Sequence, residues 1–204
     1  LDALAANPES PVLIVEGEKC KNAADAAKLP FAVATWHGGC NNWDKADWQP
    51  IANRRVVLWP DCDSERERLS KAERDAGAAP DSKPYKPREK QGGWLAMQGI
   101  AARLAAQGCE VYTVAVPAPG VWPHGYDIAD ALADGGRLVD PAAVLSWQHR
   151  ADWLIEYRPI EDDGTESLRD IEDNPPPAPK WLDGADDMPP PENPEQADGG
   201  DAGG

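Results

Sequence analysis

Cysteine, long apolar runs and basic residues are all scarce in this chain of 204 residues. The four cysteines, Cys20, Cys40, Cys62 and Cys109, are widely and irregularly spaced, which excludes both a disulfide framework and a CxxC zinc motif. The longest apolar runs, such as VLIV and VVLW, are far too short to cross a bilayer. No basic stretch followed by an apolar run stands near the start, so we expect no signal peptide, no membrane partner and a cytoplasmic protein.

Basic residues are outnumbered, with 20 Lys and Arg against 36 Asp and Glu and a formal net charge of −16. Such acidity by itself argues against a nucleic-acid partner, because phosphate backbones are bound by basic groups. The excess is unevenly placed, since residues 1–159 carry 18 basic and 22 acidic residues whereas residues 160–204 carry 2 and 14. The main part of the chain is therefore nearly neutral, which removes most of the objection to nucleic acid.

The acidic end of the chain, residues 160–204, contains eight prolines and no Val, Phe or Tyr. It cannot bury enough apolar surface to offset the entropy that it would lose on ordering. We therefore predict a disordered acidic tail or linker at 160–204, a lead-in at 1–10 and one compact domain at 11–159.

Short apolar runs alternate with amphipathic or Ala-rich segments along this domain. Continuous apolar runs are typical of strands buried on both faces, as in parallel sheets. The pattern predicts strands at 11–17, 31–36, 54–63 and 109–117. It predicts helices at 18–29, 65–76, 94–108 and 126–136. This alternation indicates an α/β fold with a mainly parallel four-stranded sheet flanked by helices, interrupted by a charged insertion at 64–93.

Acidic residues follow three of the predicted strands. Glu16 ends the first strand, Asp61 and Asp63 end the third, and Asp127 and Asp130 follow the fourth. The carboxyl ends of parallel strands are where ligands gather, so we expect these side chains to share one edge of the sheet. Crowded carboxylates repel one another, and Mg²⁺, which prefers oxygen ligands, relieves that repulsion. The alternative is that these acids are helix caps and surface charges, with Asp127 capping the next helix.

Three segments of the chain resemble the TOPRIM domain of primases, topoisomerases and related nucleases. They are LIVEGEK at 13–19, VVLWPDCD at 56–63 and GYDIADAL at 125–132. The first contains the Glu-Gly motif of that family, and the second contains its Asp-x-Asp motif. The order of the segments and the Ala-rich helix after EGEK are most similar to the domains of phage and plasmid primases and primase–helicases. The resemblance covers about residues 10–135 and implies a Rossmann-like fold.

The resemblance also implies a function, which is Mg²⁺- or Mn²⁺-dependent nucleotidyl transfer in primer synthesis for DNA replication. The substrates would be single-stranded DNA template and nucleotides, the partner a helicase domain or subunit, and the setting a bacterial or phage-infected cell. Asp61 and Asp63 would hold the metal, and Asp127 would complete the site. Glu16 would bind metal or exchange a proton with the 3′-oxygen. Lys19 would meet a phosphate, unless it is simply a solvated helix lysine.

Two other functions remain open for the same residues. One is a TOPRIM-type metal-dependent nuclease, which would nick plasmid DNA without nucleotides. The other is a non-catalytic nucleic-acid or protein interaction module, which would bind no Mg²⁺ or Mn²⁺ through Asp61 and Asp63.

The charged insertion contains a short basic segment, KPYKPREK. Basic residues that follow a nucleic-acid backbone, interleaved with an aromatic residue that stacks on a base, are typical of single-strand binding. The alternative is a mobile polar loop. The residues predicted to contact nucleic acid are Lys83, Tyr85, Lys86, Arg88 and Lys90.

The acidic tail would screen this basic segment if it acts as a DNA mimic. Deleting residues 160–204 is then expected to tighten single-stranded DNA binding at low salt, because the like charges that repel the strand are gone. Fluorescence anisotropy at low and high salt measures the change. Unchanged affinity at low salt would make the tail a plain linker.

Overall fold

The computed structural model describes residue 4, residues 8–146 and residues 150–158. The predicted tail at 160–204 and most of the predicted lead-in at 1–10 lie outside the described residues. Within the described part of the chain, no helix is both long enough and apolar enough to span a membrane.

Five strands form one sheet in the order β2-β1-β3-β4-β5. The first four strands are parallel, which confirms an α/β fold with a mainly parallel sheet. The prediction of four strands was incomplete, because β5 pairs antiparallel with β4 at the edge of the sheet. β5 has only three residues, two of them exposed, so it lacks the apolar run that marks a buried strand. The strands are β1 (Val12–Val15), β2 (Ala32–Ala34), β3 (Arg55–Trp59), β4 (Glu110–Val114) and β5 (Leu154–Glu156).

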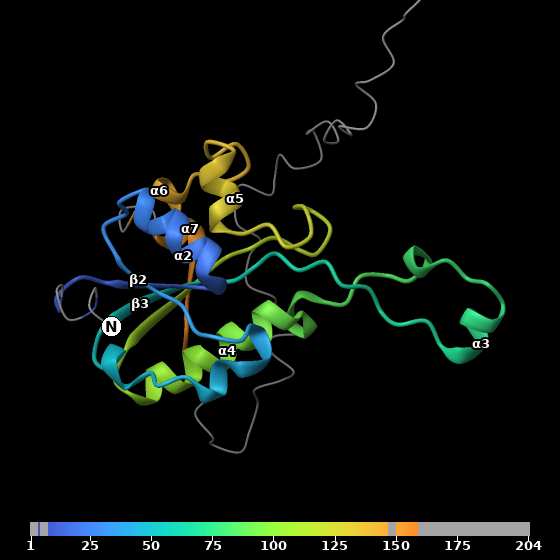
Figure 1. Ribbon diagram of the computed structural model, residues 1–204, viewed down its shortest axis with the longest axis horizontal. Helices are drawn as coiled ribbons and strands as arrows, with labels where there is room; N and C mark the ends of the chain where they lie inside the picture. The colour runs from blue at the N-terminus through green and yellow to red at the C-terminus, as the bar shows by residue number, and fades with distance from the viewer. Residues whose placement is uncertain (1–3, 5–7, 147–149, 159–204) are drawn as a thin grey trace, which may run out of the picture. The chain divides into compact units, whose positions relative to one another are not determined.

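Helices cover both faces of the sheet (Figure 1). One face carries α2 (Gly17–Ala26), α5 (Ile128–Ala133), α6 (Pro141–Val144) and α7 (Arg150–Trp153), and the other carries α4 (Gly92–Ala106). The predicted helices at 18–29, 94–108 and 126–136 correspond to α2, α4 and α5. Short 3₁₀ turns at Cys40–Lys45 and Gln49–Ile51 connect β2 to β3.

The largest part of the core lies between the sheet and α4. Alternate residues of β1 and β3 point to this face, as the two-residue period of a strand requires. Gly99 of α4 allows the Trp43 ring to pack against the helix, because a Cβ at this position would lie 2.2 Å from the ring. The fully buried residues that meet here are Val12, Ile14, Val56, Leu58, Met97, Ile100 and Leu104.

Residues 64–91 form an arm that projects from the domain (Figure 1). Its two legs run side by side, since the Glu67 N–H donates to the Pro84 carbonyl at 3.0 Å and the Lys86 N–H donates to the Glu65 carbonyl at 2.9 Å. The short helix α3 (Lys71–Asp75) lies between the legs along the chain. The helix predicted at 65–76 is therefore wrong in its first half. Ser70 caps α3 through a capping box, so the residues before it belong to an extended leg.

Gln91 joins the two legs at the root of the arm and is only 2% exposed. Its Oε1 accepts the Glu65 N–H at 3.0 Å, and its Nε2 donates to the Glu65 carbonyl at 3.2 Å and to the Lys86 carbonyl at 2.8 Å. One buried amide thus satisfies three backbone groups, and no apolar side chain could replace it in this role.

Replacing Gln91 by Leu is expected to lower the free energy of unfolding by about 2 kcal/mol, because the Glu65 N–H and the Lys86 carbonyl lose their side-chain partner. Trypsin should also cleave the arm faster than in the wild-type protein. Urea denaturation and timed proteolysis measure the two effects. Gln98→Leu within α4 is the control, and equal behaviour of the two variants would contradict the role of Gln91.

Candidate metal centre

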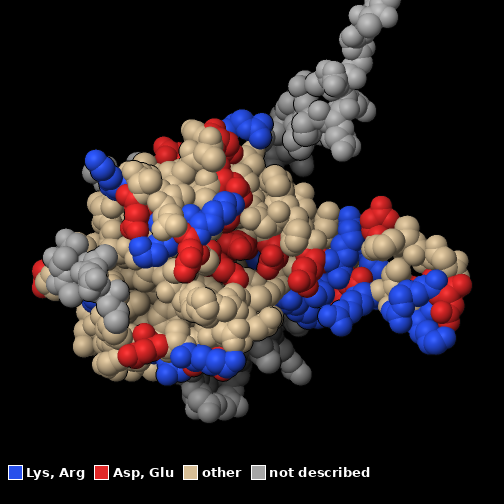
Figure 2. All heavy atoms as spheres, in the orientation of Figure 1, with Lys and Arg blue, Asp and Glu red and all other residues tan. Residues whose placement is uncertain are grey.

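The predicted carboxylates lie at the point where the sheet reverses its strand order. From β1 the chain crosses to β2 on one side, whereas β3 lies on the other side of β1, and such a switch point is where open α/β sheets bind ligands. Glu16 follows β1 directly, Asp61 and Asp63 follow β3, and Asp127 begins α5. Figure 2 shows acidic side chains in the middle of one face, beside the mixed charges of the arm.

Glu16 and Asp63 both lie against Gly93, in the first turn of α4. The Gly93 N–H donates to Asp63 Oδ2 at 2.8 Å. A Cβ at Gly93 would stand 3.3 Å from that oxygen and 3.5 Å from Glu16 Oε2, so a larger residue would crowd the Asp63 carboxylate and contact that of Glu16. Burial and the nearby Asp63 charge raise the pKa of Glu16, although the Cys40 N–H that it accepts opposes this. Glu16 therefore holds a proton more readily than an ordinary glutamate does.

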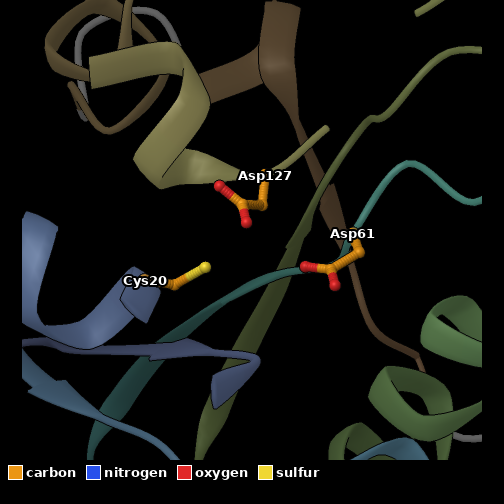
Figure 3. A group of neighbouring side chains, drawn as sticks. All are labelled: Cys20, Asp61 and Asp127. Carbon is orange, nitrogen blue, oxygen red and sulfur yellow. The ribbon is translucent and has the colours of Figure 1, made fainter. Parts of the chain in front are cut away.

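A second group, made of Cys20, Asp61 and Asp127, could hold a metal ion. One ligand atom from each residue lies within 4.8 Å of the other two. Figure 3 shows the three side chains converging from α2, from the end of β3 and from the start of α5. Cys20 and Asp127 are buried and Asp61 is partly buried. Asp61 also belongs to the surroundings of Glu16 and Asp63, so it links the two groups.

Asp61 is the least compensated acid of the site. Its Oδ1 is buried and has no hydrogen-bond partner among the described residues. Burial raises the pKa of Asp61 to about 8, and the carboxylates of Glu16, Asp127 and Asp63 act in the same direction. A bound cation would supply the missing partner, and the mostly oxygen donor set fits a hard divalent ion such as Mg²⁺ or Mn²⁺.

Asp127 combines the two interpretations given above, because it caps α5 and also lies in the metal group. Its Oδ1 accepts the Asp130 N–H at 2.9 Å, and the Asp130 side chain completes the capping box. Although burial acts to raise it, hydrogen bonds from the Asp130 N–H, the Cys20 thiol and Lys19 hold the pKa of Asp127 below its usual range. Asp127 is thus ionised and available to a cation.

Lys19, predicted to meet a phosphate, pairs with acids of this site. Its Nζ donates to Asp127 Oδ2 at 3.0 Å and to Asp130 Oδ1 at 2.9 Å. These bonds raise the pKa of Lys19. Two of the three ammonium hydrogens are thus donated to carboxylates, and the third is left for a phosphate.

The arm residues predicted to contact nucleic acid mostly have partners of their own. Lys83 pairs with Glu73, and Lys86 pairs with Glu65. The Arg88 guanidinium stacks 4.4 Å from the centre of the Trp94 ring and donates to the Val116 carbonyl.

Tyr85 and Lys90 differ in how accessible their side chains are to a nucleic acid. The Tyr85 side chain is 39% exposed, but Arg66 lies over its ring at 3.9 Å from the centre, so one ring face is already covered. Lys90 is exposed and has no ion-pair partner among the described residues. Nucleic-acid binding by the arm stays a prediction, and Lys90 is the residue best placed for it.

Sequence reasoning missed two residues of the site, Cys20 and Gly93. The irregular spacing of the cysteines does not mark Cys20 as a ligand, yet Cys20 stands four residues after Glu16 and so shares one side of the first turns of α2. The same spacing repeats at Ala24, which is also buried. For Gly93 the sequence offered no signal, because its role arises from the approach of α4 to the end of β3.

Comparison with protein-family models, with curated proteins and with solved structures found no match. What supports a function is therefore the chemistry of the side chains described above.

The raised pKa of Asp61 makes the stability of the metal-free protein depend on pH. In the unfolded chain Asp61 ionises near its ordinary pKa of 3.8, whereas in the folded protein it holds its proton up to about pH 8. Between these values the folded state binds more protons, so its free energy of unfolding falls as the pH rises. Asp61→Asn removes this loss and should stabilise the metal-free protein at pH 8 by several kcal/mol, with little effect at pH 4.

Urea denaturation across this pH range in a chelating buffer measures the difference. Asp25→Asn, a change of an exposed acid on α2, is the matched control. Parallel pH profiles for the wild type and Asp61→Asn would show that Asp61 is not held in its protonated form.

Proposed function

We propose that this chain is a TOPRIM-type catalytic domain of a phage or mobile-element DNA primase. It would carry out Mg²⁺- or Mn²⁺-dependent nucleotidyl transfer in primer synthesis for DNA replication. The observation that carries the proposal is the convergence of Glu16, Asp61, Asp63 and Asp127 at the switch point of a mainly parallel sheet. The buried, unpartnered Oδ1 of Asp61 adds to it.

Each acid has a distinct part in this proposal. Asp61 and Asp63 would hold the ion, with Asp127 as a further ligand. When bound, the ion would neutralise these carboxylates and draw charge from the phosphate oxygens of a nucleotide. Glu16, whose pKa is raised, would accept the proton of the attacking 3′-hydroxyl. The Gly93 N–H fixes Asp63, so one ligand is oriented before any ion arrives.

The arm would contribute the nucleic-acid contacts. It begins directly after Asp63 and ends at Gln91, two residues before Gly93, so its root adjoins the carboxylates. Lys90 lies at this root, and contact between its ammonium and a template phosphate would bring a strand close to the site. A helicase domain or subunit, single-stranded DNA and nucleotides remain the partners that this function requires.

Primer synthesis on single-stranded DNA with Mg²⁺ or Mn²⁺ tests the proposal. Asp61→Asn and Glu16→Gln should each reduce synthesis at least about a hundredfold, through loss of metal binding and of proton transfer respectively. Calorimetry should show that Asp61→Asn also weakens Mn²⁺ binding. Asp75→Asn on α3, an exposed acid paired with Lys71, should leave both measurements unchanged.

Other outcomes of the same assays would favour the alternatives. Nicking of plasmid DNA without nucleotides, lost in Asp61→Asn, would make the chain a metal-dependent nuclease. If the wild-type protein binds neither Mg²⁺ nor Mn²⁺, the site is not catalytic, and an interaction module would be the better interpretation. Synthesis that survives both substitutions would refute the proposed mechanism.

A further inference from the structure

A cavity of about 630 Å³ lies at the carboxyl end of β2. Its walls come from the end of β2 and the following loop, from the segment 46–51 and from Lys21 of α2. This volume is within the range of small-ligand pockets. None of the functions assigned above to Glu16, Asp61, Asp63 or Asp127 uses this cavity.

The cavity and the carboxylates share one loop. Strand pairing places Ile14 opposite Ala34. Two residues further along the chain, the same register places Trp36 opposite Glu16. Trp36 lines the cavity, and its Nε1 donates to the Gly39 carbonyl at 2.8 Å. The next residue, Cys40, donates its N–H to Glu16. The loop 36–40 therefore forms a wall of the cavity at one end and holds a predicted catalytic carboxylate at the other.

The lining of the cavity is apolar with a few polar groups. Trp36 and Trp48 are buried side chains whose ring centres lie 6.2 Å apart. Thr35 also lines the cavity, and its buried Oγ1 has no hydrogen-bond partner among the described residues. His37 is exposed at the same end. Such a surface suits a flat heterocycle with polar edges and an attached sugar, because a hydroxyl can both donate and accept a hydrogen bond.

We propose that this cavity binds the base and sugar of a free nucleotide whose phosphates extend to the neighbouring carboxylates. The inference rests on the proposed function, since a divalent ion on those carboxylates is what would attract the phosphates. Thr35 Oγ1 then contacts the nucleoside, and His37 closes the open end.

Calorimetry with the full chain tests the cavity separately from the metal centre. ATP and GTP with Mg²⁺, and adenosine and guanosine without it, are the ligands. Thr35→Val keeps the size of the side chain but removes the hydroxyl, and it should weaken nucleoside and nucleotide binding about fivefold. Thr113→Val, the same change in β4 away from the cavity, should leave binding unchanged. Asp61→Asn should weaken binding of the Mg²⁺-nucleotide while leaving nucleoside binding intact.

The outcomes separate this inference from the proposed function. If the wild-type protein binds Mg²⁺ but no nucleoside or nucleotide, the cavity proposal is wrong and the metal centre stands. If nucleosides bind in a Thr35-dependent way but no Mg²⁺ binds, the cavity stands and the proposed function fails. Equal affinities of Thr35→Val and Thr113→Val would overturn the assignment of the cavity. Binding of a short oligonucleotide but of neither free nucleotide would overturn the choice of a free nucleotide.

Discussion

Repulsion among carboxylates at the ends of β1 and β3 is the constraint on which the rest of this site depends. The parallel pairing of these strands fixes Glu16 and Asp61 as neighbours, and neither can move away without breaking the centre of the sheet. The surrounding groups offset this repulsion least at Asp61, where the Lys19 charge alone acts to lower the pKa. The Cys40 N–H donates to Glu16, the Gly93 N–H donates to Asp63, and Lys19 pairs with Asp127. Asp61 keeps a buried oxygen without a partner among the described residues, and this imbalance is the observation that most favours cation binding here.

The charges of the arm differ from those of the site, because most of them are paired within the arm. Eight basic and six acidic residues lie between 64 and 91, and pairs such as Lys83 with Glu73 and Lys71 with Asp75 join neighbouring turns and legs. Exposed pairs of this kind contribute little to stability individually. Together with the buried amide of Gln91, these ion pairs hold the polar arm in one conformation. The arm is thus an ordered extension, which sequence composition alone would not distinguish from a loop.

Much of the sheet was predictable because buried parallel strands have continuous apolar sequences. VLIV and VVLW predicted β1 and β3, and the acids that follow them predicted the position of the carboxylates. β5 was missed because an exposed edge strand of three residues has no such sequence. The partners of Tyr85 and Arg88 were missed for another reason, since Arg66 and Trp94 approach them only through tertiary contacts. Predicting that Cys20 belongs to the site requires knowing which face of α2 meets the sheet. Predicting the same for Gly93 requires knowing how α4 meets β3.

The position of β1 between β2 and β3 also has a consequence for the order of folding. β1, α2 and β2 are consecutive in the chain and can assemble as a local unit, whereas β3 joins β1 only after the intervening turns have formed. Contacts between distant segments form late, because closing the longer loop costs more entropy. Glu16 and Asp61 are therefore brought together in the step that completes the centre of the sheet. Their repulsion opposes the pairing of β3 with β1, so a divalent ion that binds both carboxylates would favour this pairing and leave the assembly of β1, α2 and β2 unaffected.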